Sequence, residues 1–167
     1  MAENLKQRGI ISEVDEMVLT IDPFGHAEDE DIKLLEKRFA IQLPVDYKEF
    51  LATQNGGRNL SYKSENSIKI NQIDEAINID TMFGINTGIK NADIEQWTEE
   101  YRNDIFDHSI IIGDTIQHGF LLFWQSGDEN AGLYYYDDTY QLEASSDENN
   151  AYFLAKTFSE FIDLIEN

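Results

Sequence analysis

Hydrophobic residues recur every three or four positions in four stretches of the chain, the spacing that places them on one face of a helix. The first stretch is Ile32, Leu35 and Phe39, and the acids Glu28–Asp31 before it suit the partial positive charge at a helix start. The other three are Tyr47, Phe50 and Leu51; Ile94, Trp97, Tyr101 and Ile105; and Leu154, Phe158, Phe161, Ile162 and Ile165. The pattern therefore predicts four amphipathic helices, the last over residues 152–165.

The second stretch lies between residues that begin and end helices. Pro44 suits a first helical turn, because its missing N–H needs no partner there. Asn55, Gly56 and Gly57 follow the stripe and tolerate the positive φ that a helix C-cap needs. The sequence therefore predicts a helix that stops sharply before the chain turns into a strand. Asp93, with a glutamine three residues later, predicts a capping box before the third helix.

The remaining apolar runs predict strands, because they are short, rich in β-branched or aromatic residues and separated by turn residues. They are residues 58–73 with a Ser-Glu-Asn turn, Ile77–Ile85, Ser109–Ile112, Phe120–Trp124 and Gly132–Tyr136. Apolar residues between Ile10 and Val18 fit a helix, although Val18, Leu19 and Ile21 also fit an extended chain. Short connections between the later strands favour an antiparallel meander, and the polar residues 137–150 predict a loop.

These elements predict an α+β fold, with a mainly antiparallel central sheet covered by N-terminal helices, a mid-chain helix and a C-terminal helix. The length of 167 residues fits a single domain over residues 1–167. The N-terminus has no apolar signal-peptide core, and no apolar run is long enough for a membrane span. Together with the absence of cysteine, this predicts a cytoplasmic protein.

Net charge narrows the possible partners. Thirty-three acids and twelve bases give a formal charge of −21, which disfavours nucleic acid and anionic membranes as partners. Residues 1–90 hold sixteen acids and ten bases, a net of −6, whereas residues 91–167 hold seventeen acids and two bases, a net of −15. Two interpretations fit this asymmetry: the acids keep the protein in solution, or they steer a basic partner onto the second half.

Catalytic and metal-binding motifs are missing. There is no nucleophile elbow, phosphate-binding loop or His-Glu-x-x-His motif, and His26, His108 and His118 lie at no ligand spacing from one another. The segment from Asp128 to Asn130 lacks the glycine and the final glutamate of a calcium-binding EF-hand loop. We therefore expect a protein that is not an enzyme and that uses no metal or cofactor.

The aromatic run Tyr134-Tyr135-Tyr136 has two interpretations. In a strand Tyr134 and Tyr136 share one face, and Tyr135 takes the other. One face can pack on the C-terminal helix while the other stays half-exposed. Alternatively, an exposed tyrosine beside Asp137 and Asp138 anchors a protein partner, a role in which tyrosine is enriched.

Residues at the junctions of the predicted elements resemble the SUKH superfamily. Its first pattern is an acid-opened helix, then Leu-Pro-x-Asp-Tyr-x-x-Phe-Leu, then Asn-Gly-Gly. The matching residues are Ile32, Leu35, Leu43, Pro44, Asp46, Tyr47, Phe50, Leu51, Asn55, Gly56 and Gly57. Later patterns are matched by Ile111, Ile112, Gly113, Asp114 and Gly119, by the strand Gly132–Asp137, and by Ala155, Phe158 and Phe161. The resemblance covers the core region 28–165, but the family varies where this chain has Asn86–Asp107.

The resemblance implies a binding protein without enzymatic activity. Bacterial members look like cytoplasmic immunity proteins, antidotes that bind a cognate toxin domain, often a nuclease. A founding fungal member regulates cell-wall synthesis, so a regulatory scaffold for host proteins is the alternative. Because nucleases that grip phosphate are commonly basic, an acidic antidote would be complementary to such a toxin.

The residues expected to contact that partner lie in the acidic second half. They are Asp104, Asp107, Asp114, Asp128, Glu129, Tyr135, Asp137, Asp138 and Glu143. The acids would face lysines and arginines of the toxin, and Tyr135 or another exposed aromatic residue would be the apolar anchor. The alternative surface is the polar side of the helix that contains Trp97, with Glu95, Glu99 and Glu100.

Overall fold

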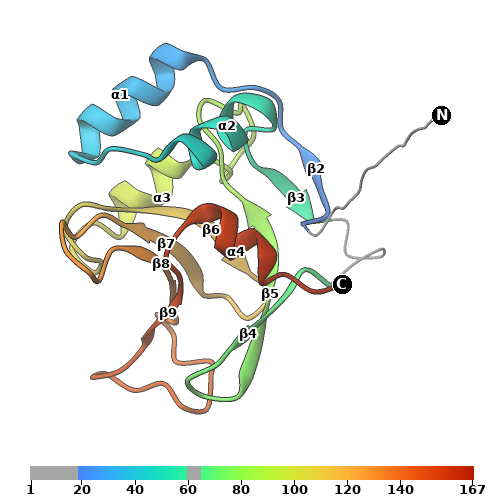
Figure 1. Ribbon diagram of the computed structural model, residues 1–167, viewed down its shortest axis with the longest axis vertical. Helices are drawn as coiled ribbons and strands as arrows, with labels where there is room; N and C mark the ends of the chain where they lie inside the picture. Colours follow the sequence, from blue (N-terminus) through green and yellow to red (C-terminus); the bar gives the residue numbers. More distant parts are fainter. Residues whose placement is uncertain (1–18, 60–64) are drawn as a thin grey trace.

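The computed structural model describes residues 19–59 and 65–167. The predictions for Ile10–Val18, and for strand residues Leu60 and Tyr62, lie outside the described residues. Figure 1 shows α1 and α2 together at one end of the molecule and the hairpin of β4 and β5 projecting from the other.

An eight-stranded antiparallel sheet forms the centre of the fold. Its order is β2-β3-β5-β6-β7-β8-β9, with β4 paired to β5 beside this path. The strands are β2 Ile21–Pro23, β3 Gly57–Asn59, β4 Ser67–Ile70, β5 Glu75–Met82, β6 Ser109–Thr115, β7 Phe120–Trp124, β8 Gly132–Tyr136 and β9 Ala151–Ala155. Spatial order therefore follows chain order along this path, and the predicted antiparallel meander of β6, β7 and β8 is confirmed.

Within residues 19–59 and 65–167, four helices cover the two faces of this sheet, in agreement with the predicted α+β fold. They are α1 Asp29–Phe39, α2 Val45–Thr53, α3 Ile94–Glu100 and α4 Phe158–Asp163. The ring of Tyr47 on α2 lies 5.9 Å from Phe123 of β7 and 4.9 Å from Phe158 of α4. Trp97 of α3 instead lies 5.4 Å from Phe120 of β7. Because Phe120 and Phe123 point to opposite faces of the strand, α2 and α4 cover one face and α3 covers the other.

The segment after α2 has the sharp stop that the sequence predicted. Asn55 and Gly56 take φ values of 53° and 80°, and Gly57 begins β3. The side chain of Asn55 donates to and accepts from the backbone of Ile85, both at 2.8 Å, and so joins this turn to the chain after β5. Pro44 differs slightly from the prediction: it is the N-cap residue, one position before the first helical turn.

The predicted helix over 152–165 is wrong in its first third. Residues 151–155 form β9, which pairs with β8 and buries Tyr152 and Ala155. The helix begins only after Thr157, whose side chain accepts from the backbone N–H of Glu160 at 3.1 Å. The carboxylate of Glu160 in turn accepts from the N–H of Lys156 at 3.2 Å. This capping pair marks the true helix start.

The third helix also departs from the prediction. It ends at Glu100, so Ile105 lies outside it. The capping box predicted at Asp93 is not formed, because the carboxylate of Asp93 accepts from the backbone N–H of Thr87 at 3.0 Å. Gln96 donates to the side chain of Asn91 instead. These bonds fold the loop before α3 against the helix.

Candidate protein-binding face

The sheet face that carries α3 is only partly covered by that helix. Beyond the helix, four rings form a continuous row, which we call the aromatic row: Phe106, Trp124, Tyr134 and Phe153. Phe106 stacks on Trp124 with 4.0 Å between centroids, and Tyr134 meets the edge of Trp124 at 5.5 Å and that of Phe153 at 5.5 Å. Phe153 is 38% exposed and the other three rings are half-buried. Because side chains alternate along a strand, Trp124 lies on the same face of β7 as Phe120, and this is the face that α3 partly covers.

A hollow of about 480 Å³ lies beside α3. We call it the aromatic hollow. Its lining includes the rings of Trp97, Tyr101 and Phe120 and the carboxyl groups of Asp80, Asp114 and Asp138. Phe120 lies 5.4 Å from Trp97 and 4.8 Å from Tyr101, so the three rings form one packed aromatic side. The hollow thus joins an apolar surface to three acids from separate segments of the chain.

The carboxyl groups of the hollow are poorly compensated. Burial, and then the charge of Asp80, raise the pKa of Asp114 to about 7, although the N–H of Thr81 donates to it at 3.0 Å and Arg58 acts in the opposite direction. Burial also raises the pKa of Asp138, and one of its carboxylate oxygens is covered without a hydrogen-bond partner among the described residues. Both acids would therefore gain from a nearby positive charge.

Asp114→Asn is expected to weaken the pH dependence of folding stability. The pKa of Asp114 rises from an ordinary value of 3.8 to about 7 on folding, so the native protein holds this proton more tightly than the unfolded chain does. The resulting stabilisation is complete below pH 3.8 and is lost as the pH rises through about 7. Urea unfolding should show that the wild type loses more free energy of unfolding than Asp114→Asn between pH 5 and pH 8.

The control for this measurement is Asp163→Asn, which alters an exposed carboxyl group near the end of α4. This variant should lose stability with pH as the wild type does. Parallel curves for Asp114→Asn and the wild type would contradict the raised pKa.

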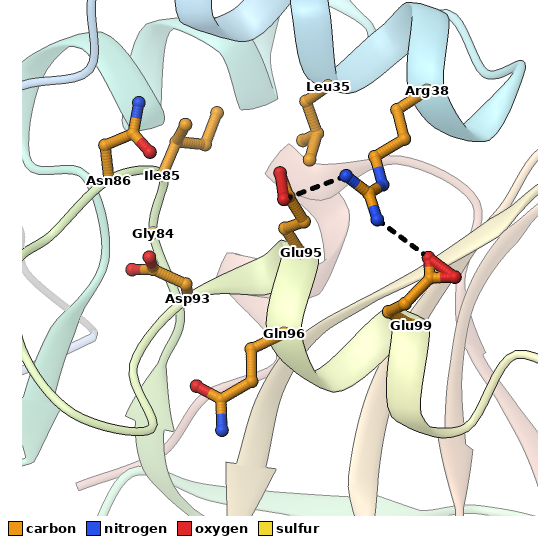
Figure 2. Close-up of a pocket in the computed structure, with 9 residues that line it drawn as sticks. All are labelled: Leu35, Arg38, Gly84, Ile85, Asn86, Asp93, Glu95, Gln96 and Glu99. Atoms are coloured by element: carbon orange, nitrogen blue, oxygen red, sulfur yellow. Dashed lines mark hydrogen bonds and ion pairs between the residues drawn. The ribbon is translucent and has the colours of Figure 1, made fainter.

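A second cavity, of about 290 Å³, lies between α1 and α3, and its lining includes Arg38 together with Asp93, Glu95 and Glu99. Figure 2 shows the guanidinium of Arg38 between two carboxylates of α3, at 3.0 Å from Glu95 and 2.9 Å from Glu99. Arg102 also contacts Glu99 at 2.7 Å. Two acids of the alternative surface, Glu95 and Glu99, are thus engaged in joining α3 to α1, whereas Glu100 is exposed. We attribute a structural role to this junction.

The ion pairs among the described residues all lie between residues 29 and 102. The bases that form them are Lys33, Arg38, Lys48, Lys69 and Arg102, and none of their acidic partners lies beyond Glu99. Lys156, in the acidic half, donates to the backbone oxygen of Glu129 at 2.8 Å. The acids after Glu99 therefore have no ion-pair partner among the described residues.

Several predicted partner residues are exposed, and some of them lie beside the aromatic row. Asp104, Asp107, Asp128 and Glu129 are all exposed. The indole of Trp124 donates to the backbone oxygen of Asp107 at 3.1 Å, and the hydroxyl of Tyr134 donates to the backbone oxygen after Glu129 at 2.7 Å. Glu143 is exposed on the 137–150 loop, where its N–H reaches the carboxylate of Glu75, at the start of β5.

Two predicted partner residues are wrong, because both are fully buried. Tyr135 is 0% exposed, and its hydroxyl lies 3.0 Å from that of Thr115 in the interior. Asp137 is also 0% exposed. Its carboxylate accepts from the backbone N–H groups of Gln141 and Leu142, both at 2.9 Å, and so holds the 137–150 loop. The half-exposed tyrosines are those on the other face of β8.

Sequence patterns did not assign Asp80, Phe106, Trp124 or Phe153 to this face. A signal existed for Trp124, because strand alternation from Phe120 identifies it as a member of the same face. Phe153 was hidden by the incorrect assignment of β9 to a helix. No local pattern marks Phe106, which lies outside the regular elements.

Two classes of site find no support in the described residues. Nowhere in 19–59 or 65–167 do three or more histidines or acids converge as ligands for a metal ion. No helix in these ranges has the length and hydrophobicity needed to cross a membrane. The candidate site is therefore the acidic and aromatic face, which we define as the aromatic row, the aromatic hollow and the exposed acids Asp104, Asp107, Asp128 and Glu129.

Comparison with known proteins agrees with the sequence resemblance. No curated protein matches the chain. The model of the SMI1 / KNR4 family (SUKH-1) matches residues 26–164, close to the predicted core region of 28–165. This match spans the four described helices, the strands from β3 to β9 and the acidic and aromatic face. The chain belongs to the SMI1 / KNR4 family (SUKH-1).

Proposed function

We propose that this chain is a cytoplasmic immunity protein, without enzymatic activity, that binds and neutralises a cognate toxin domain. Membership of the family supports a function of the immunity-protein or SMI1/KNR4 type and implies a protein partner. The proposed toxin is a basic nuclease, and the proposed interface is the acidic and aromatic face.

One observation carries this proposal: exposed acids without ion-pair partners among the described residues lie beside an open row of aromatic rings and near the aromatic hollow. Aromatic side chains in the middle of a charged border are typical of protein interfaces, where the rings supply most of the binding free energy. The border acids Asp104, Asp107 and Glu129 would face the lysines and arginines with which a nuclease holds phosphate. Their long-range attraction would also speed association, which benefits an antidote that must act before its toxin does.

The test is a binding and inhibition experiment with the purified protein. The ligand to look for is the C-terminal domain of a large secreted protein that a neighbouring gene would encode. We expect a stoichiometric complex in size-exclusion chromatography, loss of nuclease activity in that complex, and at least tenfold weaker binding at 300 mM than at 50 mM NaCl, as attraction between opposite charges is screened.

Each other result would overturn a defined part of the proposal. The absence of a complex would remove the toxin as partner. A complex that leaves the nuclease active would favour a regulatory scaffold. Binding indifferent to salt would remove the acids from the interface and leave the aromatic row as its main contact.

A further inference from the structure

We infer that the aromatic hollow is a socket for one arginine side chain of the protein partner. This inference specifies how the proposed interface recognises its partner, and it rests on the proposed function only in naming that partner as a toxin domain. The hollow lies beside α3, between β5, β6, β7 and the start of the 137–150 loop.

The shape and surface of the hollow fit a long cationic side chain. Its volume of about 480 Å³ is open to solvent and large enough to admit a long side chain. Trp97 of α3 and Tyr101, the residue after α3, are both half-buried and line the hollow. Phe120 lines it from β7. Aromatic rings attract cations over their faces and also cover the aliphatic stem of a long side chain. An uncharged polar side chain would not use the attraction between the rings and a cation.

The charged residues that line the hollow favour a cation. Asp80, Asp114 and Asp138 line the hollow, and the described residues that line it include no lysine or arginine. His118, which also lines it, and Arg58, which acts on Asp114 from β3, are the nearby groups that oppose these acids. The raised pKa values of Asp114 and Asp138 support the conclusion that this compensation is incomplete.

The separation of the three carboxyl groups favours an organic cation over a metal ion. The three carboxyl groups come from different segments and do not converge as ligands around one point, and the described residues hold no such cluster elsewhere. A guanidinium group is planar and has five N–H donors, so it can reach separated carboxylates while lying against an aromatic ring. The carboxyl groups of Asp80, Asp114 and Asp138, which line the hollow, are the acceptors available to it. An ammonium group is smaller and strongly hydrated, which favours arginine over lysine.

The test uses short peptides, because it then needs no knowledge of the partner. Three probes differ only in the central side chain: acetyl-Gly-Arg-Gly-amide, the same peptide with citrulline, and the same peptide with lysine. The chain contains two tryptophans, Trp97 in the hollow and Trp124 in the aromatic row. Their indole N–H signals, assigned by Trp→Phe variants, report binding at the hollow and provide an internal reference outside it.

We expect the arginine peptide to shift the Trp97 signal saturably, and to move the Trp124 signal little. Citrulline, which has the shape of arginine without its charge, should produce no saturable shift. The double variant Asp80→Asn/Asp138→Asn should raise the Kd of the arginine peptide about tenfold, because two charged acceptors become neutral. The matched double variant Glu148→Gln/Asp163→Asn, which alters two exposed acids outside the hollow, should leave it within about twofold.

Three results would overturn the inference. They are equal shifts from citrulline and arginine, equal shifts of both indole signals, and a Kd unchanged in Asp80→Asn/Asp138→Asn. Equal binding of lysine would overturn the preference for guanidinium. Because no toxin is present, peptide binding without a toxin complex would refute only the proposed function. A toxin complex without peptide binding would refute only the socket.

Discussion

Gly56→Val is expected to lower the free energy of unfolding by about 3 kcal/mol or more, because it combines backbone strain with overpacking. Gly56 takes a φ of 80°, a conformation in which a β-branched residue is strained. A Cβ at this position would also meet the backbone of Met82 and Phe83 at the end of β5. Neither backbone can move easily, since both belong to the region where β5 joins the turn after α2. Thermal and urea unfolding measure the effect.

Gly88→Val is the matched control. Gly88 has a φ of 74°, nearly the same as Gly56, but a Cβ there would have no atom within 4 Å. The control therefore carries the conformational strain alone, and the difference between the two variants isolates the collision with β5. Equal losses in both variants would show that the collision is relieved. An unchanged melting temperature in Gly56→Val would refute the positive φ itself. The folded fraction of Gly56→Val should still bind the partner, because the turn lies outside the acidic and aromatic face.

The triple reversal Asp104→Lys/Asp107→Lys/Glu129→Lys is expected to slow association with the proposed toxin domain by about 10- to 100-fold at low salt. These three acids are exposed. Asp107 and Glu129 lie beside the aromatic row and Asp104 lies near the aromatic hollow, so all three belong to the face that a partner would approach. The variant should also flatten the dependence of the association rate on salt, because the steering charges are gone. Stopped-flow or surface-based kinetics at several NaCl concentrations measure both quantities.

The control reverses three exposed acids elsewhere: Glu49→Lys/Glu148→Lys/Asp163→Lys. Both variants change the formal charge by the same amount, so any difference between them reports position and not total charge. We expect the control to change the association rate by no more than about threefold. If the two variants slow association equally, net charge steers the partner and the acidic and aromatic face has no special role.

The elements supported by unambiguous local patterns could be predicted from sequence. Ile32, Leu35 and Phe39 are all buried on α1, and the positive φ values at Asn55 and Gly56 follow from the residue types alone. The last helix could not be placed, because Leu154 and Phe158 have helical spacing although a strand and a helix meet between them. The capping pair of Thr157 and Glu160 was the available signal for the boundary.

The candidate site was only partly predictable, because it depends on contacts between distant segments. Asp137 and Asp138 are neighbours in sequence, yet Asp137 is enclosed by the 137–150 loop while Asp138 lines the aromatic hollow. The choice between the two faces of β8 likewise depends on what packs against each. The local sequence does not indicate that the side chain of Tyr135 is buried, or that Asp80 of β5 and Asp114 of β6 line the same hollow.

The order of the strands along the sheet has one more consequence. Because neighbours in the path from β2 to β9 follow the order of the chain, the uneven charge of the sequence becomes uneven charge in space. The strands from β6 onward come from residues 91–167, with a net charge of −15. The earlier strands come from residues 19–59 and 65–90, where twelve acids and seven bases give a net charge of −5. The molecule thus has an electric dipole moment along its sheet. Near a positively charged partner, this dipole would turn the β7–β9 end of the molecule toward that partner before the two proteins are in contact.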